Sequence, residues 1–214
     1  MILRLRSGQA LRTHQRGVAL VAVLIALSLF GALAFSLVMV TNTEMRAASN
    51  HAAGREAFHA ADGAVEIAAQ ELLEVADWNT VLGGASVSRF ADGPPAGSRQ
   101  LADGRTISLP DLTAAADSEA RPWGANNPRW RLFAFGPLGP ANYVIVWVGD
   151  DPAENDGDPT QDGRDASNPG AGIVAIRAEA FGARHARKVI EATVRRGAEP
   201  SFESVEILSW LEVR

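Results

Sequence analysis

The sequence predicts an α+β protein in which one long N-terminal helix packs on an antiparallel β-sheet. Three observations support this class. No proline occurs between residues 18 and 75, where alanine, leucine, glutamate and arginine dominate. From Gly83 onward, glycine and proline turn signals separate short apolar or alternating segments. About 140 residues follow the helix, enough for one domain with a single core.

The first forty residues combine a basic leader, residues 1–17, with an apolar run, residues 18–40. The leader carries four arginines and no acid, and the run has no charged residue. About 20 helical residues at about 1.5 Å each cover the ~30 Å apolar core of a bilayer, so the run can span it. Because moving arginine across that core is costly, the leader is expected to stay cytoplasmic and the rest to be exported. The residues expected in the membrane include Val18, Leu20, Val21, Leu24, Leu27, Phe30, Leu33 and Phe35.

The position of the small residue Gly17 bears on processing. A cleaved secretory signal has an apolar stretch of roughly 7 to 15 residues with the cleavage site on its far side, whereas Gly17 precedes the apolar run. Two interpretations remain open: an unprocessed one-pass anchor, or cleavage between Gly17 and Val18. Cleavage would lower the count of Lys and Arg from 20 to 16 against 25 acids, and the net charge from −5 to −9.

The junction from Gln15 to Leu20 (QRGVAL) resembles the site at which prepilin peptidase cuts the class III signal peptides of type IV pilins and type II secretion pseudopilins. Residues 43–47 (TEMRA) and 55–64 (REAFHAADGA) are similar to the N-terminal domain of PilX-type minor pilins. The similarity covers residues 15–73. It implies processing after Gly17, insertion in the inner membrane with a periplasmic head, and later assembly with other pilins and the pilus assembly machinery at the cell surface.

One departure from major pilins concerns the fifth residue of the mature chain. Major pilins carry glutamate there, and cleavage after Gly17 would place Ala22 at that position. The resemblance therefore implies a minor or priming subunit, acting without catalysis in pilus assembly, priming or tip structure. Two alternatives remain. The chain could be a minor pseudopilin of type II secretion, or an unprocessed single-pass membrane protein whose periplasmic head binds a ligand or calcium.

The helix is expected to run from Val18 to about Val75, with residues 41–76 as its amphipathic half. There, apolar residues recur at alternating spacings of three and four, which predicts a stripe that packs on the sheet. Docking of a partner helix is the alternative use of this stripe. The stripe consists of Phe58, Ala61, Val65, Ala68, Leu72 and Val75, opposite Glu56, His59, Asp62, Glu66 and Glu71.

Residues 77–214 are expected to form a head domain. Strands are predicted at 105–109, 129–135, 143–148, 172–181, 187–194 and 204–213, between turn signals that include 136–140. Alternation in 172–181 predicts one buried face and one wetter face, which carries Arg177 and Glu179. Residues 181–185 predict a hairpin turn. Because the chain has no cysteine, the C-terminal disulfide loop of many major pilins is absent, and another fastening is expected.

The acidic loop, residues 150–170, is the one segment with a plausible metal site. Calcium loops place oxygen ligands at alternating positions around a glycine turn. The expected ligands are Asp156, Asp158, Thr160, Asp162 and the carbonyl of Arg164. Pro169 stands where a bidentate glutamate would complete such a loop, so a solvated acidic loop without metal is the alternative.

Enzyme motifs are not visible in the sequence, which contains no G-x-S-x-G, H-E-x-x-H, P-loop or G-x-G-x-x-G. The four histidines, His14, His51, His59 and His185, do not cluster, and His51 and His59 share a helix face only after two turns. The tryptophans Trp123, Trp130, Trp147 and Trp210 are expected in the core or its rim rather than on a ligand platform. No basic patch indicates nucleic acid binding. We therefore expect a protein without catalytic activity.

Overall fold

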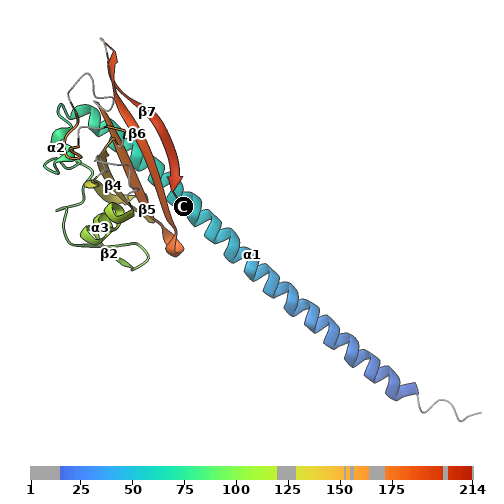
Figure 1. Ribbon diagram of the computed structural model, residues 1–214. Helices are drawn as coiled ribbons and strands as arrows, with labels where there is room; N and C mark the ends of the chain where they lie inside the picture. Colours follow the sequence, from blue (N-terminus) through green and yellow to red (C-terminus); the bar gives the residue numbers. More distant parts are fainter. Residues whose placement is uncertain are drawn as a thin grey trace, which may run out of the picture. The chain divides into compact units, whose positions relative to one another are not determined.

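The computed structural model describes residues 15–119, 129–151, 153–154, 157–163, 172–199 and 202–213. It confirms the α+β class: the described chain contains a long N-terminal helix and a five-stranded antiparallel sheet, consistent with a pilin-like fold (Figure 1). The chain divides into two compact units, Met1–Ser49 and Asn50–Arg214.

The long helix, α1, spans Gln15–Glu74 and confirms the predicted proline-free element. It ends within two residues of the predicted boundary at residue 76. A short helix, α2 (Asn79–Leu82), follows it. The first part of α1 belongs to the first unit, and its residues from Asn50 onward belong to the second.

The strands form two antiparallel sheets among the described residues. The larger sheet has the order β3-β4-β5-β6-β7, so each strand pairs with its neighbour in the sequence. Its strands are β3 (Arg131–Leu138), β4 (Asn142–Asp150), β5 (Ile173–Phe181), β6 (Arg187–Glu199) and β7 (Phe202–Val213). The smaller sheet pairs β1 (Ser98–Gln100) with β2 (Thr106–Ser108).

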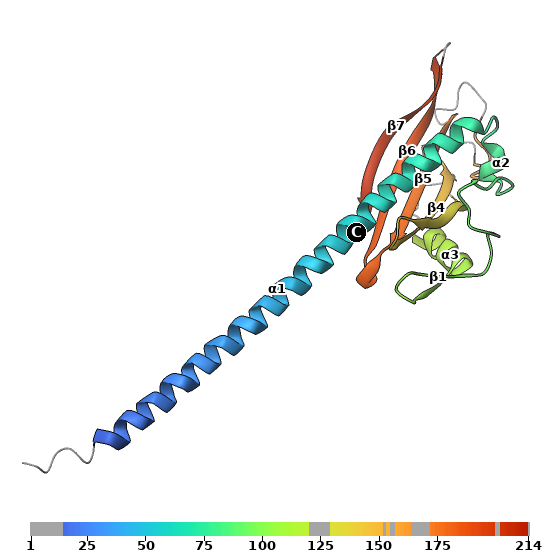
Figure 2. The ribbon, with the colours of Figure 1, turned by 180° about the vertical axis from the view of Figure 1, so that it is seen from behind.

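In the second unit, the C-terminal half of α1 lies on one face of the larger sheet (Figure 2). The predicted stripe makes this contact: Ala61, Val65, Ala68 and Leu72 are buried, and Phe58 and Val75 are partly buried against the same core. The sheet contributes Val144, Val146, Val148, Val174, Ile176, Ala178, Ala180, Ile190, Ala192 and Val194. The interpretation of the stripe as a core surface is therefore confirmed.

The opposite face of the sheet is covered by a helix that the sequence analysis did not predict, α3 (Leu109–Glu119). Its start has ordinary helix signals. The Ser108 hydroxyl accepts a hydrogen bond from the Asp111 amide at 3.3 Å, and Pro110 lies in the first turn, where its missing N–H is not needed. The predicted strand at 105–109 is consequently shorter, ending at Ser108.

Because both faces of the sheet are covered, the prediction that one face of residues 172–181 is more exposed to water is wrong. Every residue of β5 is buried, including Arg177 and Glu179 at 4% and 2% exposure. Their charges are compensated by ion pairs. Arg177 lies 2.6 Å from Glu191 and 2.5 Å from Glu119 of α3, and Glu179 binds Arg187 of β6.

Two of the predicted turns, at 136–140 and at 181–185, can be compared with the structure. Gly136 and Pro137 lie inside β3, so the part of the predicted turn at 136–137 is wrong, and the chain reverses after Leu138 instead. Proline is tolerated there because β3 is an edge strand. The hairpin turn at 181–185 is confirmed, with Arg184 and His185 at φ values of 55° and 64°.

The chain has no disulfide to fasten the helix to the sheet, and Arg196 of β6 makes this connection instead. Its guanidinium donates hydrogen bonds to the carbonyl oxygens of Val75 at 2.6 Å and Ala76 at 3.1 Å, just beyond the end of α1. It also lies 4.5 Å from the ring centroid of Trp78, whose indole N–H binds the Leu72 carbonyl at 2.9 Å. A cation at the carbonyl end of a helix is favourable, and this one ties α1 to β6.

Candidate functional site

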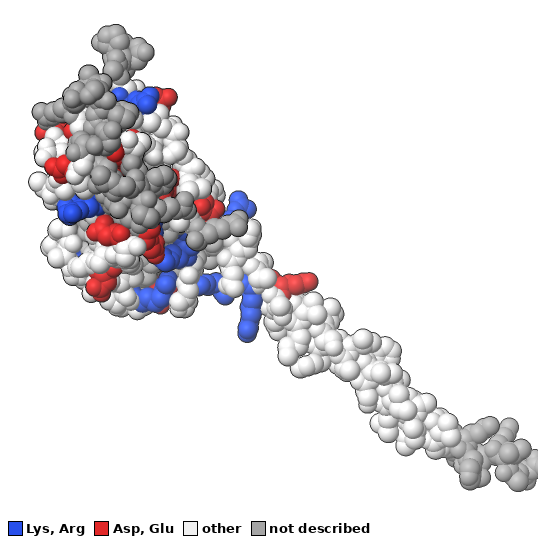
Figure 3. Space-filling view, in the orientation of Figure 1, with Lys and Arg blue, Asp and Glu red and all other residues white. Residues whose placement is uncertain are grey.

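All residues of the apolar run, 18–40, lie in the first part of α1. Its large apolar side chains are exposed by 53% (Val40) to 70% (Val18) within the described chain. Figure 3 shows this part of the helix as a surface without charged side chains. α1 is the one helix of the described residues that is long and apolar enough to cross a membrane by length and composition. The predicted residues all lie in it: Val18, Leu20, Val21, Leu24, Leu27, Phe30, Leu33 and Phe35.

Two hydroxyl groups, one within the run and one just after it, form hydrogen bonds inside the helix. The Ser28 hydroxyl donates to the Leu24 carbonyl at 2.9 Å, and the Thr43 hydroxyl donates to the Met39 carbonyl at 3.0 Å. Such bonds satisfy hydroxyl donors without water, which suits a helix surrounded by lipid or by other apolar helices. The geometry is thus compatible with burial of this segment in an apolar medium.

Gly17 and Val18 lie near the start of α1, and Ala22 lies one turn further on. A Cβ atom built on Gly17 would have no described neighbour within 4 Å. The glycine at this position therefore has no packing explanation within the described chain. The predicted cleavage between Gly17 and Val18 stays a prediction.

In the acidic loop, the described candidate ligands are engaged by the protein itself. One Asp158 carboxylate oxygen accepts hydrogen bonds from the Thr160 hydroxyl at 2.6 Å and the Thr160 amide at 3.1 Å, and these bonds hold the pKa of Asp158 below its usual value. Asp162 donates its amide to the side chain of Asn79 in α2 and accepts the Gly172 amide, each at 2.7 Å. The loop is thus tied to α2 and to the start of β5.

Asp156 and Arg164 lie outside the described residues. Within the described part of the loop and the rest of the described chain, no three His, Cys, Asp or Glu side chains are grouped as they would be around a metal ion. At the base of the loop, Asp150, Asp151 and Glu154 are buried. Calcium binding remains a prediction.

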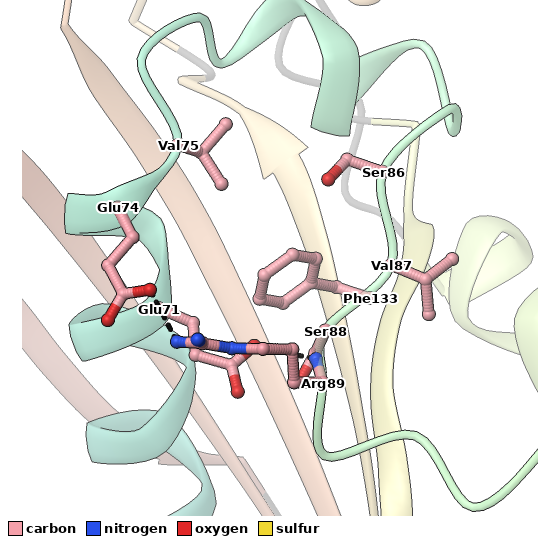
Figure 4. Close-up of a pocket in the computed structure, with 8 residues that line it drawn as sticks. All are labelled: Glu71, Glu74, Val75, Ser86, Val87, Ser88, Arg89 and Phe133. Carbon is pink, nitrogen blue, oxygen red and sulfur yellow. Dashed lines mark hydrogen bonds and ion pairs between the residues drawn. The ribbon is translucent and has the colours of Figure 1, made fainter.

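An open pocket of about 250 Å³ lies between the end of α1 and the segment that precedes β3 (Figure 4). Its polar lining is already paired: Arg89 forms an ion pair with Glu74, and its amide donates to Glu71 at 3.1 Å. Phe133 and Val75 supply apolar walls. Because Arg89 and Glu74 are largely exposed, this pair adds little binding energy for a ligand.

A polar network links the buried Tyr143 of β4 to the exposed Asp92 and the partly buried Arg99. The Tyr143 hydroxyl donates to Asp92 at 3.0 Å, and Asp92 pairs with Arg99 at 2.8 Å. Burial, and secondly the hydrogen bond to the Asp92 carboxylate, raises the pKa of the Tyr143 phenol above its ordinary value. The phenol is therefore a donor that stays protonated at neutral pH, and it fixes the segment before β1 to the sheet.

The tryptophans divide between core and rim, in line with the prediction for those that are described. Trp130 and Trp147 are buried, and Trp210 of β7 is 42% exposed. Trp123 lies outside the described residues. Trp78 was not predicted as a core residue, and no local pattern in the sequence indicates its contact with Arg196. The contact of Trp210 with α1 was not predicted either: the indole N–H donates to Asp62 at 3.1 Å, and the ring meets Phe58 edge to face.

Comparison with known proteins adds no relative: no family model, curated protein or solved structure matches this chain.

Proposed function

We propose that this chain is a non-catalytic subunit of a pilin-class filament, of the PilX-type minor pilin kind, which acts in pilus assembly, priming or tip structure. In this proposal, the chain is inserted in the inner membrane through residues 18–40 and cut after Gly17 by prepilin peptidase. Its head domain is then periplasmic until the subunit enters a filament.

The observation that carries the proposal is the difference in burial between the two parts of α1. From Asn50 onward, the helix buries an apolar stripe against the sheet, whereas the large apolar side chains from Val18 to Val40 remain more than half exposed. Such a surface requires an apolar environment, either lipid or neighbouring helices. In a helix bundle each side chain would bury apolar area at about 25 cal/mol per Å² relative to water. Since lipid is itself apolar, the gain from the membrane is small, and assembly would need a motor to extract the subunit.

Ala22 supports the minor-subunit form of the proposal. A carboxylate alone in an apolar core is expensive, so a buried acid in a filament needs a partner such as a neighbouring α-amine. With alanine at the fifth mature position, this subunit offers no such acid. A subunit that starts or ends a filament has no need to make that pairing on both sides.

The N-terminus of the protein from native membranes tests the proposal directly. We expect mass spectrometry to find a mature chain that begins at Val18 in cells with prepilin peptidase and an intact leader in cells without it. Gly17→Leu should block cleavage. Gly31→Leu is the matched control, because a Cβ at either glycine meets nothing within 4 Å in the described chain.

An intact leader in both strains would contradict the proposal and leave an unprocessed single-pass protein, whose acidic loop should then be titrated with calcium. If the chain is processed, the filament that contains it distinguishes a minor pilin from a type II secretion pseudopilin. Recovery of the mature chain in sheared pili supports a minor pilin. Its absence from sheared pili, together with defective protein secretion in cells that lack the chain, supports a pseudopilin.

A further inference from the structure

The two helices that cover the larger sheet differ in how much apolar surface they bury. The part of α1 from Asn50 onward contributes eight buried apolar residues to the core on its side of the sheet. α3 buries only Leu109 and Ala116, and Leu112 is partly buried. Because local unfolding is easiest where few apolar side chains are buried, α3 is expected to separate from the sheet more readily than α1.

The C-terminal half of α3 is held mainly by polar contacts. In each of them, an oxygen of an α3 side chain is the acceptor, and the donor lies in the sheet or in the residue that precedes β3. The three pairs are the Thr113 hydroxyl with the Trp147 indole N–H at 2.8 Å, the Asp117 carboxylate with the Trp130 amide at 2.7 Å, and the Glu119 carboxylate with the Arg177 guanidinium at 2.5 Å. Water can replace each partner when the helix moves away, so the net stability that these contacts add is modest.

Arg177 keeps a countercharge whether or not α3 is in place. Its guanidinium is 4% exposed and pairs with Glu119 of α3 and, at 2.6 Å, with Glu191 of β6. Separation of α3 therefore leaves the Arg177–Glu191 pair intact and leaves no buried charge alone. The Glu119 side chain is 49% exposed, so water already competes for its pair with Arg177. The Glu119–Arg177 pair can thus be broken at low cost.

Two buried donors on the α3 side of the sheet favour separation. The Trp130 indole N–H and the Arg177 Nε–H have no hydrogen-bond partner within the described chain. The two side chains are 5% and 4% exposed, and Trp130 belongs to the core on the α3 side. A buried donor without a partner destabilises the state in which it is buried. When α3 moves away, water can satisfy both donors, which offsets part of the cost of exposing the apolar residues there.

The N-terminal end of α3 is fixed. Leu109 is fully buried, and its amide donates to the Gly97 carbonyl at 3.0 Å. The preceding residue, Ser108, is the last residue of β2 and is paired with Ser98 of β1. Movement is therefore expected at the Glu119 end of the helix, with residues 108–109 as the hinge.

We propose that α3 is a hinged cover, which opens from its C-terminal end while α1 and the sheet stay packed. The Glu119–Arg177 ion pair holds the cover closed. Opening exposes part of the aromatic core on that side of the sheet, including Trp147, whose indole N–H contacts α3 in the closed state. This inference does not rest on the pilin-class assignment, because cleavage after Gly17 and opening of α3 are measured separately.

Hydrogen exchange of the full wild-type chain in detergent micelles tests the proposal without any substitution. We expect amides 113–119 of α3 to exchange at least about tenfold faster than amides 58–72 of α1. Low concentrations of urea should hardly change the α3 rates, because local opening exposes little surface, but should raise the α1 rates. Equal protection of the two helices, or an equal dependence on urea, would mean that α3 opens only when the whole domain unfolds, and would overturn the proposal.

A buried thiol reports opening from the face of α3 that contacts the core. The chain has no cysteine, so Ala116→Cys places one thiol on that face and Ala68→Cys places one on the buried face of α1. Both alanines are buried, at 3% and 0% exposure. We expect the thiol of Ala116→Cys to react with a small alkylating reagent at least about tenfold faster than the thiol of Ala68→Cys. Equal rates in variants that unfold thermally like the wild type would contradict the hinged cover, and if either variant fails to fold, the exchange experiment decides.

Neutralising Glu119 tests the ion pair. In the Ala116→Cys background, Glu119→Gln should raise the rate of thiol reaction about threefold or more, because the amide lacks the charge that pairs with Arg177. Asp111→Asn is the matched control: Asp111 is exposed and lies at the fixed end of α3, so the rate should change by less than about twofold. In the Ala68→Cys background, Glu119→Gln should leave the rate unchanged. If Glu119→Gln does not accelerate the reaction of the Ala116→Cys thiol, this pair does not hold the cover and the proposal is wrong.

Discussion

Tyr143 shows how a single buried group can make the stability of this protein depend on pH. It is the one tyrosine of the chain, it is 6% exposed, and its hydroxyl donates to the Asp92 carboxylate. Burial and this hydrogen bond both favour the protonated phenol, so the pKa is raised in the folded protein. In the unfolded chain the phenol ionises near its ordinary pKa of about 10.

The sign of the effect follows from this difference. Below pH about 10 both states keep the proton, and the stabilisation from Tyr143 is fully present. As the pH rises further, the unfolded state loses the proton while the folded state retains it, and the free energy of unfolding falls. We expect the near-ultraviolet absorbance of tyrosinate to appear only together with alkaline unfolding. The Tyr143→Phe variant should lose this part of the pH dependence. A folded protein whose phenol titrates near pH 10 would contradict the assignment.

At the scale of elements, the fastening of α1 to the sheet depends on Arg196. The Arg196→Met variant keeps an apolar side chain but removes two charge-assisted hydrogen bonds and the contact with Trp78. We expect it to lower the free energy of unfolding by about 1–3 kcal/mol. Arg196→Lys should be intermediate, because lysine keeps the charge but not the planar fork.

The neighbouring Arg195→Met is the matched control. Arg195 is exposed and is paired with Ile173 in the sheet, away from the end of α1. Its replacement should change stability by no more than about 0.5 kcal/mol. Urea unfolding of the full chain in detergent, followed by tryptophan fluorescence, measures both variants. Equal losses would mean that the helix end is not fastened by Arg196.

The elements that could be predicted are those whose local pattern agrees with their environment. α1 has no proline and a clear stripe, and β5 to β7 have long alternating segments with a recognisable turn. The prediction failed where the tertiary environment decides. Gly136 and Pro137 are typical of a turn but are tolerated in an edge strand. The alternation predicted Arg177 and Glu179 on a solvent-exposed face, whereas α3 covers that face and ion pairs compensate their charges. α3 was missed because its eleven residues show little periodicity, despite the cap at Ser108.

At the scale of the whole molecule, the candidate site was accessible from the sequence because an apolar run without charge is itself the signal. The order of the strands and the exposure of their side chains were not accessible, since both emerge only when the sheet is assembled. The fastening at Arg196 was missed for the same reason: it joins residues that are 120 positions apart. Long-range contacts of this kind leave no local pattern in a single sequence.

The apolar run should hold the mature chain in the membrane even after the leader is removed, which distinguishes this protein from one with a cleaved secretory signal. An arginine at the centre of a membrane helix costs about 2.5–3.5 kcal/mol, whereas each leucine, isoleucine, phenylalanine or valine contributes about 0.3–0.6 kcal/mol. Two central arginines therefore offset on the order of ten apolar residues, a large part of this run. We expect the double variant Leu27→Arg with Phe30→Arg to leave the membrane fraction on alkaline extraction.

Met45→Arg is the matched control for that measurement. Met45 is 57% exposed on the same helix but lies beyond the apolar run, so an arginine there should leave the chain membrane-bound. The wild-type chain should resist alkaline extraction both with its leader and after cleavage. Release of the processed wild type would mean that residues 18–40 do not hold the chain in the bilayer. In that case, the exposed apolar surface of α1 would have to be covered by protein before the subunit leaves the membrane.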